Sequence, residues 1–138
     1  MRYLAIDHGK KRTGLAVCDA GETIASPLTV LETLAGLIEK IAEIIETEEI
    51  EAVVIGLPLN MDDTEGSQAK LVRRFAENLK QKVGLPVLLH DERLSSFEAK
   101  QKLADAELSP AKKRKRLDAI AAAEILQSFL DKKHDRAV

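Results

Sequence analysis

Ala52-Val53-Val54-Ile55-Gly56 is the stretch that decides the fold class, because an unbroken apolar run of this length is typical of a strand buried on both faces of a sheet. Apolar residues from Leu34 to Ile45 precede it at helical spacing. A loop at 57–65 and a second helix from about Ser67 to Lys82 follow, and they lead to another apolar strand at 87–89, which we also expect to be buried. Two strand-helix units of this kind predict an α/β fold with parallel strands.

The residues upstream of these units predict antiparallel strands. Three short apolar segments, 2–7, 13–19 and about 23–31, are separated by turns that contain glycine. We therefore expect a mixed five-stranded sheet, made of a three-stranded antiparallel meander and two parallel strands, with helices on its flanks.

Helical signals continue after the last strand. Ser95 with Glu98 three residues later forms a capping box for a third helix. Ser109-Pro110 is typical of the start of a short helical piece, and a last helix is expected from about Leu117 to Lys132. With no internal repeat or linker, the 138 residues are expected to form one domain, 1–138.

Composition indicates a globular protein of a reducing compartment. Hydrophobic residues make up 45% and charged residues 32% of the chain, and the formal net charge is −2. The single cysteine, Cys18, excludes an internal disulfide and is expected to be a small buried apolar residue. No segment has the pattern of a signal peptide or the length of a membrane span, so we expect a cytoplasmic protein without membrane contact.

The charges are unevenly distributed along the chain. Residues 22–65 hold eleven acids and a single base, Lys40, whereas five adjacent bases occupy 112–116, just before Asp118. A solvated helix face explains the acidic region. For the basic run, a solvated face and contact with phosphate are both open, because five adjacent cations repel one another unless an anion is near.

Acidic residues stand at the positions where α/β folds form sites. Asp7 ends the first strand, and Asp91 and Glu92 end the last parallel strand, where ligands collect in open sheets. Asp118 begins a helix rich in alanine that can approach the sheet closely. Two structural roles compete with this interpretation, since an acid can stabilise a turn at a strand end or favour the dipole at a helix start.

If these carboxylates meet, they need a cation. Two carboxylates about 4 Å apart repel each other by roughly 1 kcal/mol in water and by about 4 kcal/mol at an effective dielectric constant near 20. Oxygen ligands favour Mg²⁺ or Mn²⁺, and no cysteine and histidine spacing suggests zinc. Such ions would activate a water and stabilise the leaving oxygen of a phosphodiester. Side chains alternate along a strand, so only one of Asp91 and Glu92 is expected to reach the metal, and the sequence does not decide which.

Basic and amide side chains near these acids are candidates for nucleic-acid contact. A glycine turn after Asp7 is followed by three cations, and the loop at 57–65 is longer than a turn requires, which leaves both a simple turn and a phosphate contact open. His8 and His90 could relay protons, but structural roles are favoured. The candidates for nucleic-acid binding are Lys10, Lys11, Arg12, Asn60, Arg93, Lys112, Lys113, Arg114, Lys115 and Arg116.

Four motifs together carry a family resemblance. They are Asp7-His8-Gly9-Lys10-Lys11-Arg12-Thr13-Gly14, Val54-Ile55-Gly56-Leu57-Pro58-Leu59-Asn60-Met61-Asp62, His90-Asp91-Glu92-Arg93-Leu94-Ser95 and Leu117-Asp118-Ala119-Ile120-Ala121-Ala122. In this order, and spanning nearly the whole chain, they resemble the YqgF family, which is related to the RuvC resolvases.

The resemblance implies an RNase H-like fold and places the family's metal-binding acids at Asp7, Glu92 and Asp118, with Asp91 beside them. One departure is Asp63, which stands where the family usually has glycine. Aspartate tolerates the left-handed backbone region better than most residues, so we expect the loop to keep its shape.

Members of this family resemble metal-dependent nucleases that mature the 5′ end of precursor 16S ribosomal RNA, and they were earlier named, provisionally, Holliday-junction resolvases. The resemblance therefore implies a hydrolase that acts on structured nucleic acid, with precursor rRNA favoured as substrate and ribosomal particles as partners. We expect a monomer or a weak homodimer. Two alternatives remain: resolution of four-way DNA, which calls for a symmetric dimer, and a nucleic-acid-binding module without catalysis.

Overall fold

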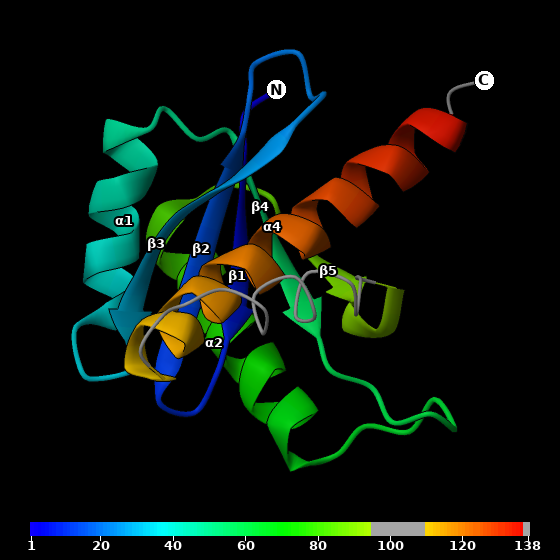
Figure 1. Cartoon of the computed structure of the whole chain (residues 1–138). Coiled ribbons are helices and arrows are strands. Elements are labelled where there is room, and N and C mark those ends of the chain that lie inside the picture. Colours follow the sequence, from blue (N-terminus) through cyan, green and yellow to red (C-terminus); the bar gives the residue numbers. More distant parts are fainter. Residues whose placement is uncertain (95–109, 137–138) are drawn as a thin grey trace.

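The computed structural model of the protein describes residues 1–94 and 110–136, with side chains for 1–93 and 117–135. Its sheet is five-stranded, with the order β3-β2-β1-β4-β5 (Figure 1). β1 pairs antiparallel with β2, and β2 with β3, whereas β4 runs parallel to both β1 and β5. The predicted mixed sheet is confirmed. Its strands are β1 (Tyr3–His8), β2 (Arg12–Cys18), β3 (Ala25–Glu32), β4 (Ala52–Leu57) and β5 (Val87–Asp91).

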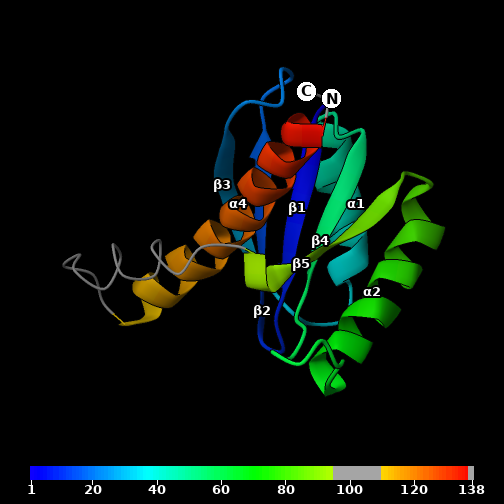
Figure 2. The ribbon, with the colours of Figure 1, turned by 90° about the vertical axis from the view of Figure 1, so that its right-hand side faces the viewer.

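Helices cover both faces of the sheet. α1 (Leu37–Thr47) and α2 (Ser67–Val83) lie on one face, and the long α4 (Pro110–Arg136) crosses the other (Figure 2). A short 3₁₀ helix, η1 (Glu92–Leu94), follows β5 directly. In the described part of the chain, no helix is long and apolar enough to cross a bilayer.

The alternation of side chains along β1 divides the interior into two cores. Leu4 and Ile6 point toward α1 and α2, where they pack with Ile41 and Leu79. Tyr3 and Ala5 point the other way, into the core under α4. The next residue in this second set is Asp7, so the strand itself directs Asp7 to the α4 face.

Two helix boundaries differ from the predicted ones. α1 begins at Leu37 rather than Leu34, because Gly36 takes a left-handed conformation (φ 88°) at its N-cap, and Leu34 is left 66% exposed. The helical piece at Pro110 and the last helix are one continuous α4, since no glycine or further proline between them interrupts it.

The prediction that the strand at 87–89 is buried is wrong. Its apolar run suggested a buried strand, but β5 is an edge strand, and Leu88 and Leu89 are 40% and 37% exposed. An apolar run shows that residues prefer burial and does not distinguish a central strand from an edge. The helix predicted from the Ser95 capping box lies outside the described residues.

Candidate active site

Asp7 and Asp118 are brought together by the close approach of α4 to β2. Asp7 pairs with Gly14 across the β1–β2 ladder. A Cβ atom at Gly14 would overlap the backbone carbonyl of Asp118, so only glycine leaves room for the helix at this point. Asp118 therefore lies against the residue that neighbours Asp7, on the same face of the sheet.

Glu92 reaches this face from the adjacent strands. Gly56 pairs with His90 of β5, and a Cβ atom at Gly56 would lie 3.7 Å from Cγ of Glu92 and 2.5 Å from Cδ1 of Ile125 in α4. Gly56 follows Ile55, which pairs with Ile6 next to Asp7. The backbone thus gathers Asp7, Glu92 and Asp118 at one end of the sheet, beneath α4.

The carboxylate of Asp118 has a cationic partner in this structure. Nε of Arg12 donates to Oδ2 of Asp118 at 2.6 Å, and both side chains are about one-third exposed (32% and 27%). Among the residues with described side chains, no three acids, histidines or cysteines are arranged to hold a metal ion. Three carboxylates remain a fitting donor set for a hard divalent cation, provided that Arg12 releases Asp118.

The two adjacent acids at the end of β5 have different surroundings. Asp91 accepts hydrogen bonds from Nε and Nη2 of Arg93, at 3.0 and 2.7 Å, and these bonds hold the pKa of Asp91 below its ordinary value. Glu92 instead lies beside Gly56 under α4. This difference favours Glu92 over Asp91 as the acid directed toward Asp7.

The loop after β4 is a closed turn rather than an open connection. Leu59 and Glu65 form an isolated antiparallel bridge, and the Asn60 amide donates to the Thr64 carbonyl at 2.9 Å. Asp63 has φ 69°, which is the left-handed backbone region that aspartate tolerates better than most residues. The side-chain amide of Asn60 donates to Oγ1 of Thr64 at 2.9 Å and helps to close the loop.

Arg93 joins this loop to the end of β5. Its Nη2 donates to Oδ1 of Asp63 at 2.7 Å, and its Nη1 donates to the carbonyls of Asn60 and Met61 at 2.9 and 3.5 Å. Asp91 and then Asp63 raise the pKa of Arg93 above its ordinary value. No sequence signal indicates these partners of Arg93.

The two histidines next to the acids have structural partners. The ring of His8 stacks on Phe75 of α2, with centroids 4.0 Å apart, on the face opposite α4. His90 is buried, and its Nε2 lies 2.9 Å from Oγ of Ser128 in α4. Burial lowers the pKa of both histidines. The favoured structural interpretation of each agrees with these contacts.

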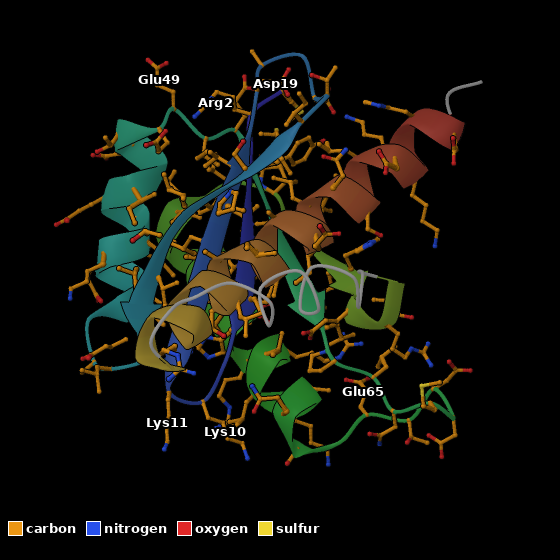
Figure 3. All side chains as sticks on the ribbon, in the orientation of Figure 1. Arg2, Lys10, Lys11, Asp19, Glu49 and Glu65 are labelled. Atoms are coloured by element: carbon orange, nitrogen blue, oxygen red, sulfur yellow. The ribbon has the colours of Figure 1, made fainter. Side chains whose placement is uncertain are left out.

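The basic candidates form two groups. Lys10 and Lys11 are exposed in the turn between β1 and β2 and, with Arg12 and the end of β3, line a pocket of about 430 Å³. Figure 3 shows both lysines at the end of the molecule that carries the loop residue Glu65. The run 112–116 lies in the first turns of α4, but its side chains are outside the described ones. Buried Cys18, whose Sγ accepts from the Tyr3 amide at 3.2 Å, has the predicted apolar setting.

Structural comparison supports the RNase H-like fold. RuvC of Thermus thermophilus in complex with a Holliday junction substrate superposes with a TM-score of 0.61 at 18% identity and covers 98% of this chain and 96% of its own. The fowlpox virus Holliday junction resolvase gives a TM-score of 0.56 at 14% identity, with 96% and 99% covered. At such identities the likeness establishes the fold alone.

Sequence comparison also identifies the family. A protein of Anaeromyxobacter sp. (strain Fw109-5) that carries the provisional name pre-16S rRNA nuclease is 46% identical over 136 residues, which is 97% of this chain and 99% of the relative. A protein of the same name from Maridesulfovibrio salexigens is 42% identical and covers 94% of this chain and 98% of its own. The model of the RuvX family, described as Holliday junction resolvase, matches residues 1–132. The chain therefore belongs to the RuvX family of nucleases, the family also called YqgF.

Proposed function

We propose that this protein is a metal-dependent endonuclease that hydrolyses phosphodiester bonds at the α4 face of its sheet, within a single RNase H-like domain that spans residues 1–138. The observation that carries the proposal is the convergence of Asp7, Glu92 and Asp118, from β1, η1 and α4, at one end of that sheet. The glycines Gly14 and Gly56 make this convergence possible, because larger residues would keep α4 away.

In this proposal Asp7, Glu92 and Asp118 hold one or two Mg²⁺ or Mn²⁺ ions, which would supply an activated water and stabilise the leaving oxygen. Arg12 forms an ion pair with Asp118 in the structure, and this pair would break when the metal binds. Its guanidinium then becomes available to the phosphate group of the substrate, since arginine suits the geometry of phosphate oxygens. During binding, Arg12 would thus exchange the carboxylate of Asp118 for a phosphate group of the substrate.

The exposed cations would bind the substrate backbone on either side of this point. Lys10 and Lys11 extend from the β1–β2 turn at the same end of the sheet (Figure 3). We also assign the basic run 112–116 to backbone contact, since it precedes Asp118 in the same helix. Each such contact releases counterions, so binding should weaken as salt concentration rises.

We propose precursor 16S rRNA as the substrate, cut during maturation of its 5′ end in the cytoplasm, with ribosomal particles as partners. The support is the name shared by relatives that are 46% and 42% identical and cover at least 94% of this chain. The second candidate is resolution of four-way DNA, which the description of the family model favours. That function would require a symmetric dimer with two active sites.

One cleavage assay separates these functions. Purified protein is incubated with a 5′ fragment of precursor 16S rRNA or with a four-way DNA junction, each with Mg²⁺, with Mn²⁺ and with a chelator. We expect metal-dependent cleavage of the RNA alone. Cleavage of the junction alone would establish the resolvase, and binding of either nucleic acid without cleavage under any condition would leave a binding module in place of the enzyme.

A further inference from the structure

Arg93 stands between the end of β5 and the loop Leu59–Glu65, and its contacts suggest a role other than phosphate binding. We infer that Arg93 is a positioning residue, which fixes this loop beside the acidic end of the sheet through an ion pair with Asp63. The inference deepens the proposed nuclease function and rests on it. It concerns how the site is kept in place rather than how a bond is broken.

The donors of Arg93 are fully used inside the protein. A guanidinium group has five N–H donors. Here Nε donates to Asp91 at 3.0 Å, Nη2 to Asp91 and Asp63 at 2.7 Å each, and Nη1 to the carbonyls of Asn60 and Met61 at 2.9 and 3.5 Å. A phosphate oxygen would have to displace one of these partners. The two carboxylates would also repel an approaching phosphate.

Asp63 supplies one of the carboxylates of this link. The family resemblance implies glycine at this position, which fits the left-handed backbone but offers no side chain. Asp63 keeps that backbone conformation, with φ 69°, and adds a carboxylate that is 81% exposed apart from its contact with Arg93. The strain of a left-handed aspartate is thus retained together with an ion pair that glycine cannot make.

The loop is closed by its own hydrogen bonds and is connected to the rest of the protein on two sides. Bonds between its two sides close it internally, from Asn60 to Thr64 and from Thr64 to Asp62. On the side facing α2, Glu65 is paired with Arg73 at 2.5 Å. Arg93 supplies the connection on the other side, next to Glu92. Loss of this connection should release the loop without unfolding it.

Arg2 offers a matched control for Arg93. Each of its three guanidinium nitrogens also donates within the protein, with Nε on the Glu48 carbonyl at 2.8 Å, Nη1 on the Cys18 carbonyl at 3.0 Å and Nη2 on the Glu48 carboxylate at 2.9 Å. The exposure of the two side chains is nearly equal, at 28% for Arg2 and 27% for Arg93. Arg2 lies at the opposite end of the sheet from the loop (Figure 3).

The test compares Arg93→Met with Arg2→Met. Both variants lose one positive charge and the internal hydrogen bonds of a partly buried arginine, three for Arg2 and six for Arg93, so thermal unfolding should show a loss of stability in each. On the nucleic acid that the wild-type protein cuts, we expect kcat to fall about 10- to 100-fold in Arg93→Met, with KM within about threefold, and kcat to stay near wild type in Arg2→Met. Arg93→Lys should not restore kcat, because lysine lacks the fork that joins two carboxylates.

Two further measurements keep the inference testable if turnover is low. Asp63→Asn retains the left-handed conformation and removes the ion pair, so it should lower kcat alone but add little in the Arg93→Met background. Amide hydrogen exchange at residues 60–64 should be faster in Arg93→Met than in Arg2→Met. This readout needs no cleavage, so it is independent of whether the proposed nuclease function holds.

Three results would overturn the inference. Equal exchange at 60–64 in the two methionine variants would show that Arg93 does not hold the loop. A rise in KM at constant kcat, with a smaller dependence of binding on salt, would make Arg93 a phosphate contact. Additive losses in the double variant would show that Arg93 and Asp63 act separately.

Discussion

On the face of the sheet covered by α1 and α2, the core is built from large aliphatic side chains such as Ile6, Ile41 and Leu79. Under α4, the residues that touch the sheet include alanines; Gly14 allows contact with the backbone of Asp118, and Gly56 leaves room for the side chain of Ile125. The face under α1 and α2 is held by tightly packed large side chains. The face under α4 depends on how closely the helix approaches the sheet. The candidate site lies on the second face, since small residues let a helix bring its acid to the acids of the strands.

Among the substitutions that compare the two faces, that of Gly14 should change stability and kcat the most. In Gly14→Ala the new Cβ meets the backbone of Asp118, which no side-chain rotation can relieve, so α4 must move. We expect a loss of about 3 kcal/mol in the free energy of unfolding and a fall of about 100-fold in kcat. Gly66→Ala is the control, because its Cβ would have only ordinary contacts, the nearest at 3.8 Å. Similar kinetics for the two variants would mean that the position of α4 does not matter.

Truncation on the opposite face should separate stability from activity. Leu79 is fully buried against the core under α1 and α2. Leu79→Ala should cost about 2–5 kcal/mol, because it leaves a cavity, while kcat per folded molecule stays within about twofold of wild type. Chemical unfolding and kinetics below the transition would measure both quantities. A fall in kcat as large as that of Gly14→Ala would remove the distinction between the faces.

The smallest expected effect lies where α4 is anchored far from the acids. Nζ of Lys133 in α4 contacts Oε1 of Glu22 at 2.6 Å and the Tyr3 hydroxyl at 3.0 Å, and its bond to Glu22 lowers the pKa of that carboxylate from its ordinary 4.5. The ionised group therefore adds stability above pH 4.5, and this contribution is lost as the pH falls below that value.

Replacement of Glu22 checks this assignment. The pair is partly exposed, so its contribution should stay below about 1 kcal/mol. Thermal unfolding from pH 7 to pH 3 should show a shallower acid loss for Glu22→Gln than for wild type, with unchanged kcat at neutral pH. Identical pH profiles would show that the anchor contributes nothing to stability.

The sequence predicted the parts of the fold that depend on local pattern. The strand predicted from the apolar run of β4 and the helix predicted from about Ser67 to Lys82 are confirmed, since each depends on local sequence. The exposure of β5 could not be predicted, because position within a sheet depends on partners elsewhere in the chain. Helical spacing extends through Leu34 and predicts a start there, whereas the left-handed Gly36 makes α1 begin at Leu37.

In the candidate site, too, some features could be predicted from the sequence and others depend on contacts in the folded chain. The positions of Asp7, Glu92 and Asp118 at one end of the sheet follow from strand order and from the family resemblance. The partners of Arg12 and Arg93 could not be predicted, since a basic residue near an acid suits an ion pair and a phosphate contact equally well. Distances in the folded chain decide between them, and both arginines contact carboxylates.

The central claim is that Glu92, rather than its neighbour Asp91, joins Asp7 and Asp118 in holding a divalent cation. Its most direct test is Mn²⁺ binding, followed by electron paramagnetic resonance of the free ion, in wild type, Glu92→Gln and Asp91→Asn. We predict that wild type and Asp91→Asn bind Mn²⁺ with similar affinity and that Glu92→Gln loses at least about tenfold. Unchanged binding in Glu92→Gln, with the loss in Asp91→Asn instead, would contradict the claim.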